Sequence, residues 1–269
     1  MMVASTGDTR AVRGTYRTVS PARIPLSAPL CMTRLARVVI PGLAHHVTQR
    51  GNGRQQVFFR DADYARYLQL LTASCAATRV SCLAYCLMPN HVHLILVPDT
   101  DDGLRRCLSV VHRAYAGALH ARLGRSGHFW QGRYGSVPMD ELHLYEALRY
   151  VLLNPVRARL TVTADAWRWS SARVYLAGES DGLTTPWRLL GLIGDMPRYL
   201  AARPDAVRLE RLRVAETIGR PAADDDFLQR LEADTGRRLR SRRRGPTARE
   251  SGARHDLRAT VTDRVDTVQ

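Results

Sequence analysis

The sequence lacks lysine, long apolar runs and paired cysteines, and these absences narrow the class of protein. No window approaches the roughly 18 consecutive apolar residues of a membrane span, which argues against a membrane protein. The five cysteines stand apart without a C-x-x-C spacing, so we expect neither a structural zinc site nor a disulfide framework. No apolar stretch of signal-peptide length follows Arg10 and Arg13, which predicts a reduced, cytoplasmic protein.

The charge is strongly one-sided. All 40 basic residues are arginines, against 25 acidic residues, which gives a formal net charge of +15. Codon bias of a GC-rich genome would explain arginine in place of lysine, but it would not explain the surplus of positive charge. A surplus of this size favours a polyanionic partner, either nucleic acid or an anionic membrane surface.

Composition divides the chain into four parts. With 269 residues, 45% of them hydrophobic, the chain can bury a full core. Residues 1–31 are rich in Ala, Ser, Thr, Pro and Arg without apolar periodicity, so we predict a disordered leader, with Met32 as an alternative start to Met1. The composition changes again after Gly178. We therefore expect one folded domain at 32–179, a helical, arginine-rich extension at 180–245 suited to a polyanion such as DNA, and a disordered tail at 246–269.

The hydrophobic pattern indicates a mixed fold. It predicts a strand at 46–50, a helix at 61–78, two strands within 80–97, a helix from 101 to about 124, a strand or loop at 127–139 and a helix at about 140–154. We expect Asp61 and Asp63 to cap the first helix and Pro155 to end the third. This order predicts an α+β fold: a ferredoxin-like βαββαβ sandwich with an added C-terminal catalytic helix and a helical, Arg-rich C-terminal extension.

Two histidines stand in the apolar run MPNHVHLILVPD, residues 88–99. On a strand, side chains two residues apart project to one face, so His91 and His93 point the same way while Val92 faces the core. This spacing can seat two imidazoles on one metal ion. The alternative is that both histidines are satisfied polar groups of a strand, and the functional interpretation needs a further ligand from elsewhere in the fold.

The helix at 140–154 offers partners for these histidines. His143, Glu146, Tyr150 and Asn154 form a polar stripe along it. The stripe is either the solvated side of an amphipathic helix or a catalytic surface that lies against the histidines. In the second case Tyr150 is an attacking phenol and Asn154 a metal ligand through its amide oxygen. Two neutral imidazoles and an amide oxygen suit Mg²⁺ or Mn²⁺ held partly by substrate.

This set of residue types fits phosphodiester chemistry. Transfer of a DNA strand requires that a phosphodiester be broken and its energy kept, and a covalent tyrosyl phosphate does both. A free phenol has a pKa of about 10, so it needs help near neutral pH. A divalent ion that draws charge from a non-bridging phosphate oxygen lowers the barrier and orients the group for in-line attack.

Several motifs together point to a family. GLAHHVTQRGNGRQQVFF, YCLMPNHVHLILVP, GHFWQGRY, YVLLNPVRARL and WRWSSARVY follow one another within about residues 34–178 and resemble the REP-associated branch of the single-tyrosine HUH transposases. The resemblance implies a bacterial protein that cuts hairpin-bearing single-stranded DNA with a divalent metal, through a 5′-phosphotyrosine intermediate. It also implies that His91 and His93 bind the metal, that Tyr150 is the nucleophile and that Asn154 is the polar ligand one turn later. Some relatives act as dimers that share a site, so a homodimer is one of two forms open to this chain.

The expected DNA contacts are aromatic and basic. Trp130 and Arg133, with Phe129 and Tyr134 beside them, either stack on and clamp unpaired bases or belong to the core. The arginine run after residue 236 is either a solvated tail or a set of phosphate contacts. The complete predicted DNA-binding set is Arg50, Trp130, Arg133, Arg237, Arg238, Arg240, Arg242, Arg243 and Arg244.

Three functional hypotheses remain open from the residues. The first is a metal-dependent DNA nickase and strand transferase, and the second is a regulator that binds hairpin DNA and cuts little or nothing. The third is a hydrolase with the two histidines on zinc, which needs an acidic residue nearby, and Glu146 is the only candidate in sequence. Tyr115 is a rival nucleophile, although its neighbours Val111 and Leu119 indicate core packing.

Overall fold

The computed structural model describes residues 37–218, 220–236, 238 and 239. The predicted leader at 1–31 and tail at 246–269 lie outside the described residues. So do five arginines of the predicted DNA-binding set, namely Arg237, Arg240, Arg242, Arg243 and Arg244.

The described part of the chain is built on one antiparallel sheet of four strands, in the order β2-β3-β1-β4. The strands are β1 (His45–Arg50), β2 (Val80–Met88), β3 (His91–Pro98) and β4 (Gly135–Pro138). A 3₁₀ turn, η1 (Asn52–Arg54), follows β1; α1 (Asp61–Thr78) leads to β2, and α2 (Gly103–Leu123) leads from β3 to β4. The predicted α+β, ferredoxin-like βαββαβ sandwich is confirmed.

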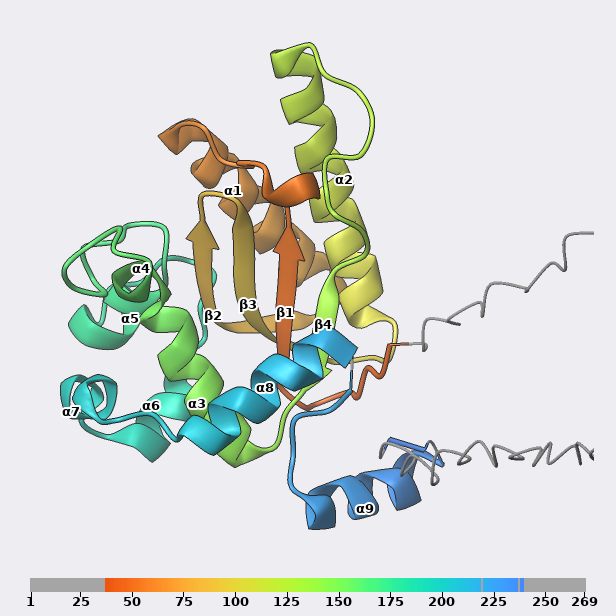
Figure 1. Cartoon of the computed structure of the whole chain (residues 1–269), viewed down its shortest axis with the longest axis vertical. Coiled ribbons are helices and arrows are strands. Elements are labelled where there is room, and N and C mark those ends of the chain that lie inside the picture. The colour runs from red at the N-terminus through yellow and green to blue at the C-terminus, as the bar shows by residue number, and fades with distance from the viewer. Residues whose placement is uncertain (1–36, 219, 237, 240–269) are drawn as a thin grey trace, which may run out of the picture. The chain divides into compact units, whose positions relative to one another are not determined.

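Helices α1 and α2 lie together on one face of this sheet (Figure 1). Alternation along β3 turns Val92, Leu94 and Leu96 towards them, and all three side chains are buried. The aromatic rings of Tyr67 and Tyr115 fill the space between the helices and the strands. This side of the sheet is a hydrophobic core.

The other face of the sheet carries α3 (Glu141–Leu152), which contacts β2 and β3. Ile95 of β3 and Leu148 of α3 share its core. The same alternation that buries Val92 on the first face directs His91 and His93 to this one. The histidines therefore lie on the face that α3 covers.

The remaining helices are α4 (Asn154–Arg157), α5 (Ala172–Ala177), α6 (Trp187–Ile193), α7 (Met196–Ala201), α8 (Ala206–Ile218) and α9 (Asp225–Thr235). Helix α8 returns to the face of the sheet that α3 covers, the site face, where it contacts both α3 and β4 (Figure 1). Leu189, Leu212 and Ala215 join the cluster that also holds Ile95 and Leu148. Residues on both sides of the boundary predicted near 180 thus share one core.

Two predicted helix ends differ in detail from the structure. The N-cap of α1 is Arg60, and Asp63 is the third residue of the helix, where its carboxylate accepts the backbone N–H groups of Phe59 and Arg60. Pro155 does not terminate helical structure after Asn154. Helix α3 ends at Leu152, and Pro155 lies in the first turn of the short helix α4, because proline is tolerated at that position.

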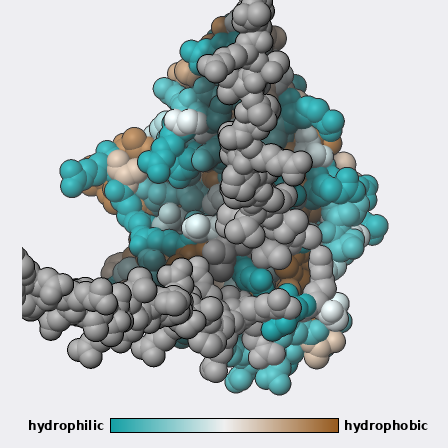
Figure 2. All heavy atoms as spheres, turned by 45° about the vertical axis from the view of Figure 1, so that its right-hand side comes forward, coloured by the Kyte–Doolittle hydropathy of each residue, from teal (hydrophilic) through white to brown (hydrophobic). Residues whose placement is uncertain are grey.

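Among the described residues that are visible in Figure 2, hydrophilic ones predominate, with small hydrophobic patches between them. Exposed large hydrophobic side chains include Val162 and Val207. None of the described helices is both long enough and apolar enough to cross a membrane.

Candidate active site

Strand pairing brings a further histidine to the pair on β3. Thr48 of β1 pairs with His93 of β3, so His46, two residues before Thr48, points to the same face of the sheet as His93. The two rings are nearly parallel, with 12° between their planes. Nε2 of His46 lies 3.0 Å from Nδ1 of His93, which is a hydrogen bond between buried atoms.

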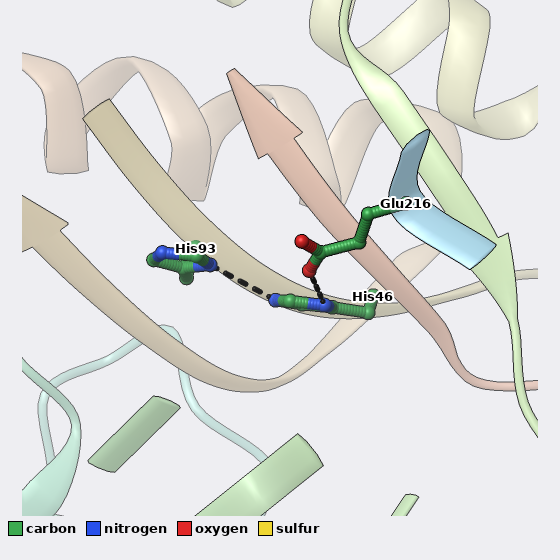
Figure 3. Close-up of side chains that lie close together, drawn as sticks. All are labelled: His46, His93 and Glu216. Carbon is green, nitrogen blue, oxygen red and sulfur yellow. Dashed lines mark hydrogen bonds and ion pairs between the residues drawn. The ribbon is translucent and has the colours of Figure 1, made fainter. Parts of the chain in front are cut away.

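A carboxylate reaches this pair from α8. Oε1 of Glu216 lies 2.7 Å from Nδ1 of His46, so the three side chains line up as carboxylate, imidazole and imidazole (Figure 3). The oxygen lies off the N–H direction, so the contact is an electrostatic one rather than a well-aligned hydrogen bond. One ligand atom from each of His46, His93 and Glu216 lies within 4.8 Å of the others, and such a cluster can hold a metal ion.

Tyr150 of α3 faces the two histidines. Its ring centroid lies 5.4 Å from that of His93 and 6.1 Å from that of His46, and both contacts are edge-on. The Arg157 guanidinium stands 4.5 Å over the Tyr150 ring. Burial raises the pKa of Tyr150 and the charge of Glu216 raises it further, while Arg157 and Arg213 act in the opposite direction.

The His91 and His93 rings lie 4.8 Å apart at a steep angle. Burial lowers the pKa of His91 to about 4, and Arg50 contributes in the same direction. Burial also places the pKa of His93 well below its ordinary value, with help from the neighbouring imidazoles of His46 and His91. Both histidines are therefore neutral at pH 7, the state in which an imidazole ligates a metal.

Asn154 lies one turn after Tyr150, at the first residue of α4. Its side chain is buried, with 9% of the residue exposed, and its amide nitrogen has no hydrogen-bond partner among the residues that the structure describes. A buried amide with an unused polar atom is uncommon in a core and is consistent with a binding role.

The rest of the polar stripe on α3 is neither solvated nor turned to the histidines. The His143 ring is buried against the Asp140 carboxylate at 2.7 Å. The Glu146 carboxylate accepts from Arg149 at 2.8 and 2.9 Å. The acidic residue beside the histidines is thus Glu216, and Glu146, the candidate named from sequence, is engaged in an ion pair on its own helix.

The aromatic residues proposed for DNA contact belong largely to the core. Phe129 and Tyr134 are buried, and Trp130 is partly buried and donates its indole N–H to the carbonyl of His112. Tyr115, the rival nucleophile, is fully buried and donates its hydroxyl to the carbonyl of Val57. A side chain that is held in this way cannot reach a phosphodiester.

The described arginines of the predicted DNA-binding set are accessible. Arg133 and Arg238 are exposed, and Arg50 is partly exposed at the end of β1, where its charge acts on His91 and His93. The structure therefore brings Arg50 to the histidines, together with Tyr150. Arg133 lies before β4, in the segment that also holds Trp130.

Sequence reasoning missed His46 and Glu216. His46 stands in the motif AHHVTQRG, and its position four residues before Arg50 on one strand places both on the same face. That spacing was a usable signal. Glu216 lies in an ordinary amphipathic segment far along the chain, with no local pattern that connects it to the histidines.

A ferredoxin-like sheet with a tyrosine set against strand-borne histidines has the features of a transposase domain. Residues 40–153 match the family described as IS200-like transposases, which confirms the resemblance found in the motifs. This part of the chain is thus similar to the IS200-like transposase family. Glu216 lies outside the matched segment.

Two solved structures are similar to the chain. One is a REP-associated tyrosine transposase bound to a REP hairpin, with 19% identity and a TM-score of 0.47 over 58% of this chain and 90% of that one. The other is a putative transposase from Deinococcus radiodurans R1, with 18% identity and a TM-score of 0.32 over 48% of this chain and 92% of that one. No curated protein matches the chain.

Proposed function

We propose that the protein is a metal-dependent endonuclease and strand transferase for single-stranded DNA that carries hairpins, and that it works through a covalent 5′-phosphotyrosine intermediate. The observation that carries this proposal is the position of Tyr150, whose ring stands edge-on to His93 at 5.4 Å on the site face of the sheet. The IS200-like family match and the net charge of +15 support DNA as the substrate.

The residues at the site fit a divalent cation. Nε2 of His93 is buried and has no hydrogen-bond partner within the described part of the chain. Nδ1 of His91 is engaged with the side-chain oxygen of Asn90, which leaves Nε2 of His91 as the lone-pair nitrogen. We propose that His91, His93 and the amide oxygen of Asn154 hold Mg²⁺ or Mn²⁺, with substrate completing the ligand set. A bound cation neutralises charge on the non-bridging oxygens of the scissile phosphate.

Tyr150 is the proposed nucleophile. Its phenolic oxygen bonds to phosphorus while the bond from phosphorus to the 3′ oxygen breaks, so the 5′ phosphate stays on the protein. The phenol loses one proton in this step and the departing 3′ oxygen gains one, which leaves a free 3′-hydroxyl. Arg157, over the ring, favours the phenolate that attacks. Attack by another 3′-hydroxyl on the phosphotyrosine reverses the step and joins a new strand.

DNA binding is assigned to the arginines around this site. Arg50 flanks the histidines, Arg133 is exposed in the segment before β4, and Arg213 of α8 acts on Tyr150. We propose that α8 and the arginine-rich segment after it extend the contact surface along the phosphate backbone. The active unit is one chain or a homodimer.

A trapping experiment tests the proposal. The protein is incubated with labelled single-stranded hairpin oligonucleotides and Mn²⁺, and a denaturation-resistant protein–DNA adduct is expected. Tyr150→Phe should abolish the adduct and leave hairpin affinity nearly unchanged. Tyr145→Phe is the matched control, because Tyr145 lies on the same helix but contacts Tyr199 instead of the histidines. Binding without any adduct from the unaltered protein would instead identify a hairpin-binding regulator.

A further inference from the structure

Glu216, His46 and His93 form a chain across three elements, α8, β1 and β3 (Figure 3). The family match ends at residue 153, so Glu216 lies beyond the matched segment. The positions of the hydrogens along these three side chains decide which nitrogen of His93 keeps a lone pair that can bind a cation.

The order can be followed from the Glu216 end. A carboxylate oxygen at 2.7 Å from Nδ1 of His46 is attracted only if that nitrogen carries a hydrogen, since two lone pairs at this distance would repel. A second hydrogen on Nε2 of His46 would have to be donated to Nδ1 of His93 and would leave the buried Nε2 of His93 as an N–H without an acceptor among the described residues, so Nε2 of His46 is taken as the acceptor. The hydrogen bond of 3.0 Å between the two imidazoles must therefore come from the N–H at Nδ1 of His93. His93 is left with its lone pair on Nε2.

The alternative is a metal ion held directly by His46, His93 and Glu216. Their ligand atoms are close enough for it. In the structure, however, Nε2 of His46 and Nδ1 of His93 point at each other at hydrogen-bond distance rather than at a common third point. The buried Nε2 of His93 would also remain without a partner. The hydrogen bond to His46 gives Nδ1 of His93 a partner and leaves its Nε2 for a cation, whereas a metal held directly by the three residues would use one nitrogen of His93 only.

We propose that Glu216 and His46 are positioning residues that hold His93 as the Nδ1–H tautomer and present its Nε2 lone pair to the catalytic cation. This inference rests on the proposed function and deepens it, because it assigns α8 to the active site. Partners of this kind behind a metal-binding histidine fix its tautomer and ring orientation, and their loss typically costs about 10- to 100-fold in metal affinity.

The tautomers can be read directly by nitrogen NMR. The full-length, metal-free protein is labelled with ¹⁵N-histidine and recorded near pH 7.5. We expect His46 and His93 as Nδ1–H tautomers, and in Glu216→Ala we expect both to shift towards the Nε2–H form that free imidazole side chains favour. Glu210→Ala is the control, since Glu210 is an exposed acid on the same helix. The proposal is overturned if His93 of the unaltered protein is the Nε2–H tautomer. It is also overturned if the spectrum does not change in Glu216→Ala.

Calorimetric titration with Mn²⁺ separates positioning from direct ligation. Glu216→Ala should weaken Mn²⁺ binding by about 10- to 100-fold. Glu216→Gln should stay within a few-fold of the unaltered protein, because its amide oxygen still faces Nδ1 of His46. An equal loss in the two variants shows that the carboxylate is itself a ligand and overturns the proposal.

Both readouts are independent of DNA cleavage. If the protein shows the expected tautomers and binds Mn²⁺ but forms no adduct, the proposed function is wrong while the positioning role of Glu216 and His46 is retained. Thermal melting of each variant confirms that the fold is kept, and Glu216→Gln keeps the test decisive if Glu216→Ala does not fold.

Discussion

The Tyr150 ring stands edge-on to the His93 ring, with 5.4 Å between their centroids. Tyr150 comes from a helix that covers the sheet, and His93 comes from a central strand of the sheet itself. The contact sets a phenol beside a neutral imidazole whose outer nitrogen is unpaired among the described residues.

Removal of Arg157 should move the pH dependence of cleavage. Arg157 opposes the rise that burial and Glu216 impose on the pKa of Tyr150, so Arg157→Ala raises this pKa further. The phenolate then forms at higher pH, and the rate of adduct formation at pH 7 falls by about tenfold for each unit of pKa. The measurement is the initial rate of adduct formation from pH 6 to 10.

Arg125→Ala is the control for this experiment, because Arg125 is exposed at the end of α2 and lies away from Tyr150 in the chain. A pH profile that is the same in Arg157→Ala and in the unaltered protein would show that Arg157 does not influence the phenol.

Removal of the metal should stop formation of the protein–DNA adduct and leave hairpin binding nearly unchanged. A chelator deprives His91 and His93 of the proposed cation, so adduct formation should cease and return when Mn²⁺ is added in excess. Hairpin affinity, which depends on arginine–phosphate contacts, should change little. Gel-shift and adduct assays on the same samples measure the two effects. Full cleavage after exhaustive chelation would contradict a metal-dependent mechanism.

Arg133→Ala should weaken DNA binding without unfolding the protein. Arg133 is exposed, and loss of one phosphate contact should lower the slope of log affinity against log salt by about one. Trp130→Ala is expected to act differently, because Trp130 packs on the core and bonds to His112. We expect it to lower the free energy of unfolding by about 3 kcal/mol. Salt titration and urea unfolding distinguish the two variants, and an unchanged slope for Arg133→Ala would remove this residue from the binding surface.

Asp63 should make the protein sensitive to acid. Burial alone would raise the pKa of Asp63, but hydrogen bonds from Arg122 and from the backbone at Phe59 and Arg60 outweigh it, and the pKa is lowered. The stability that Asp63 contributes is therefore present above its unfolded pKa of about 4 and is lost as the pH falls through the lower folded value. Asp63→Asn should cost about 2 kcal/mol at pH 7.

The same variant should lose less stability than the unaltered protein between pH 5 and pH 3. Urea unfolding at both pH values measures this difference. Parallel losses in the two proteins would mean that other carboxylates dominate the acid response.

Local patterns predicted the parts of the site that local geometry determines. The two-residue period of a strand put His91 and His93 on one face, and the helical period put Tyr150 one turn from Asn154. The order of strands and helices predicted the ferredoxin-like sheet, because few topologies connect them without crossings.

What could not be predicted depends on long-range packing. The contact of His46 with His93 requires the register between β1 and β3, which the strand sequences do not specify by themselves. Glu216 reaches the site because Leu212 and Ala215 dock α8 on the same core as α3. The aromatic residues around Trp130 looked equally suited to DNA and to the core, since both surfaces use the same side chains.

The position of Glu216 on α8 has an evolutionary consequence. The motif-bearing region and the helix that carries Glu216 are separate stretches of the chain, so under the proposed role of Glu216 substitutions in α8 would alter metal binding while every signature residue stays intact. On this proposal, two relatives with identical motifs would differ in cutting rate through substitutions in α8 alone.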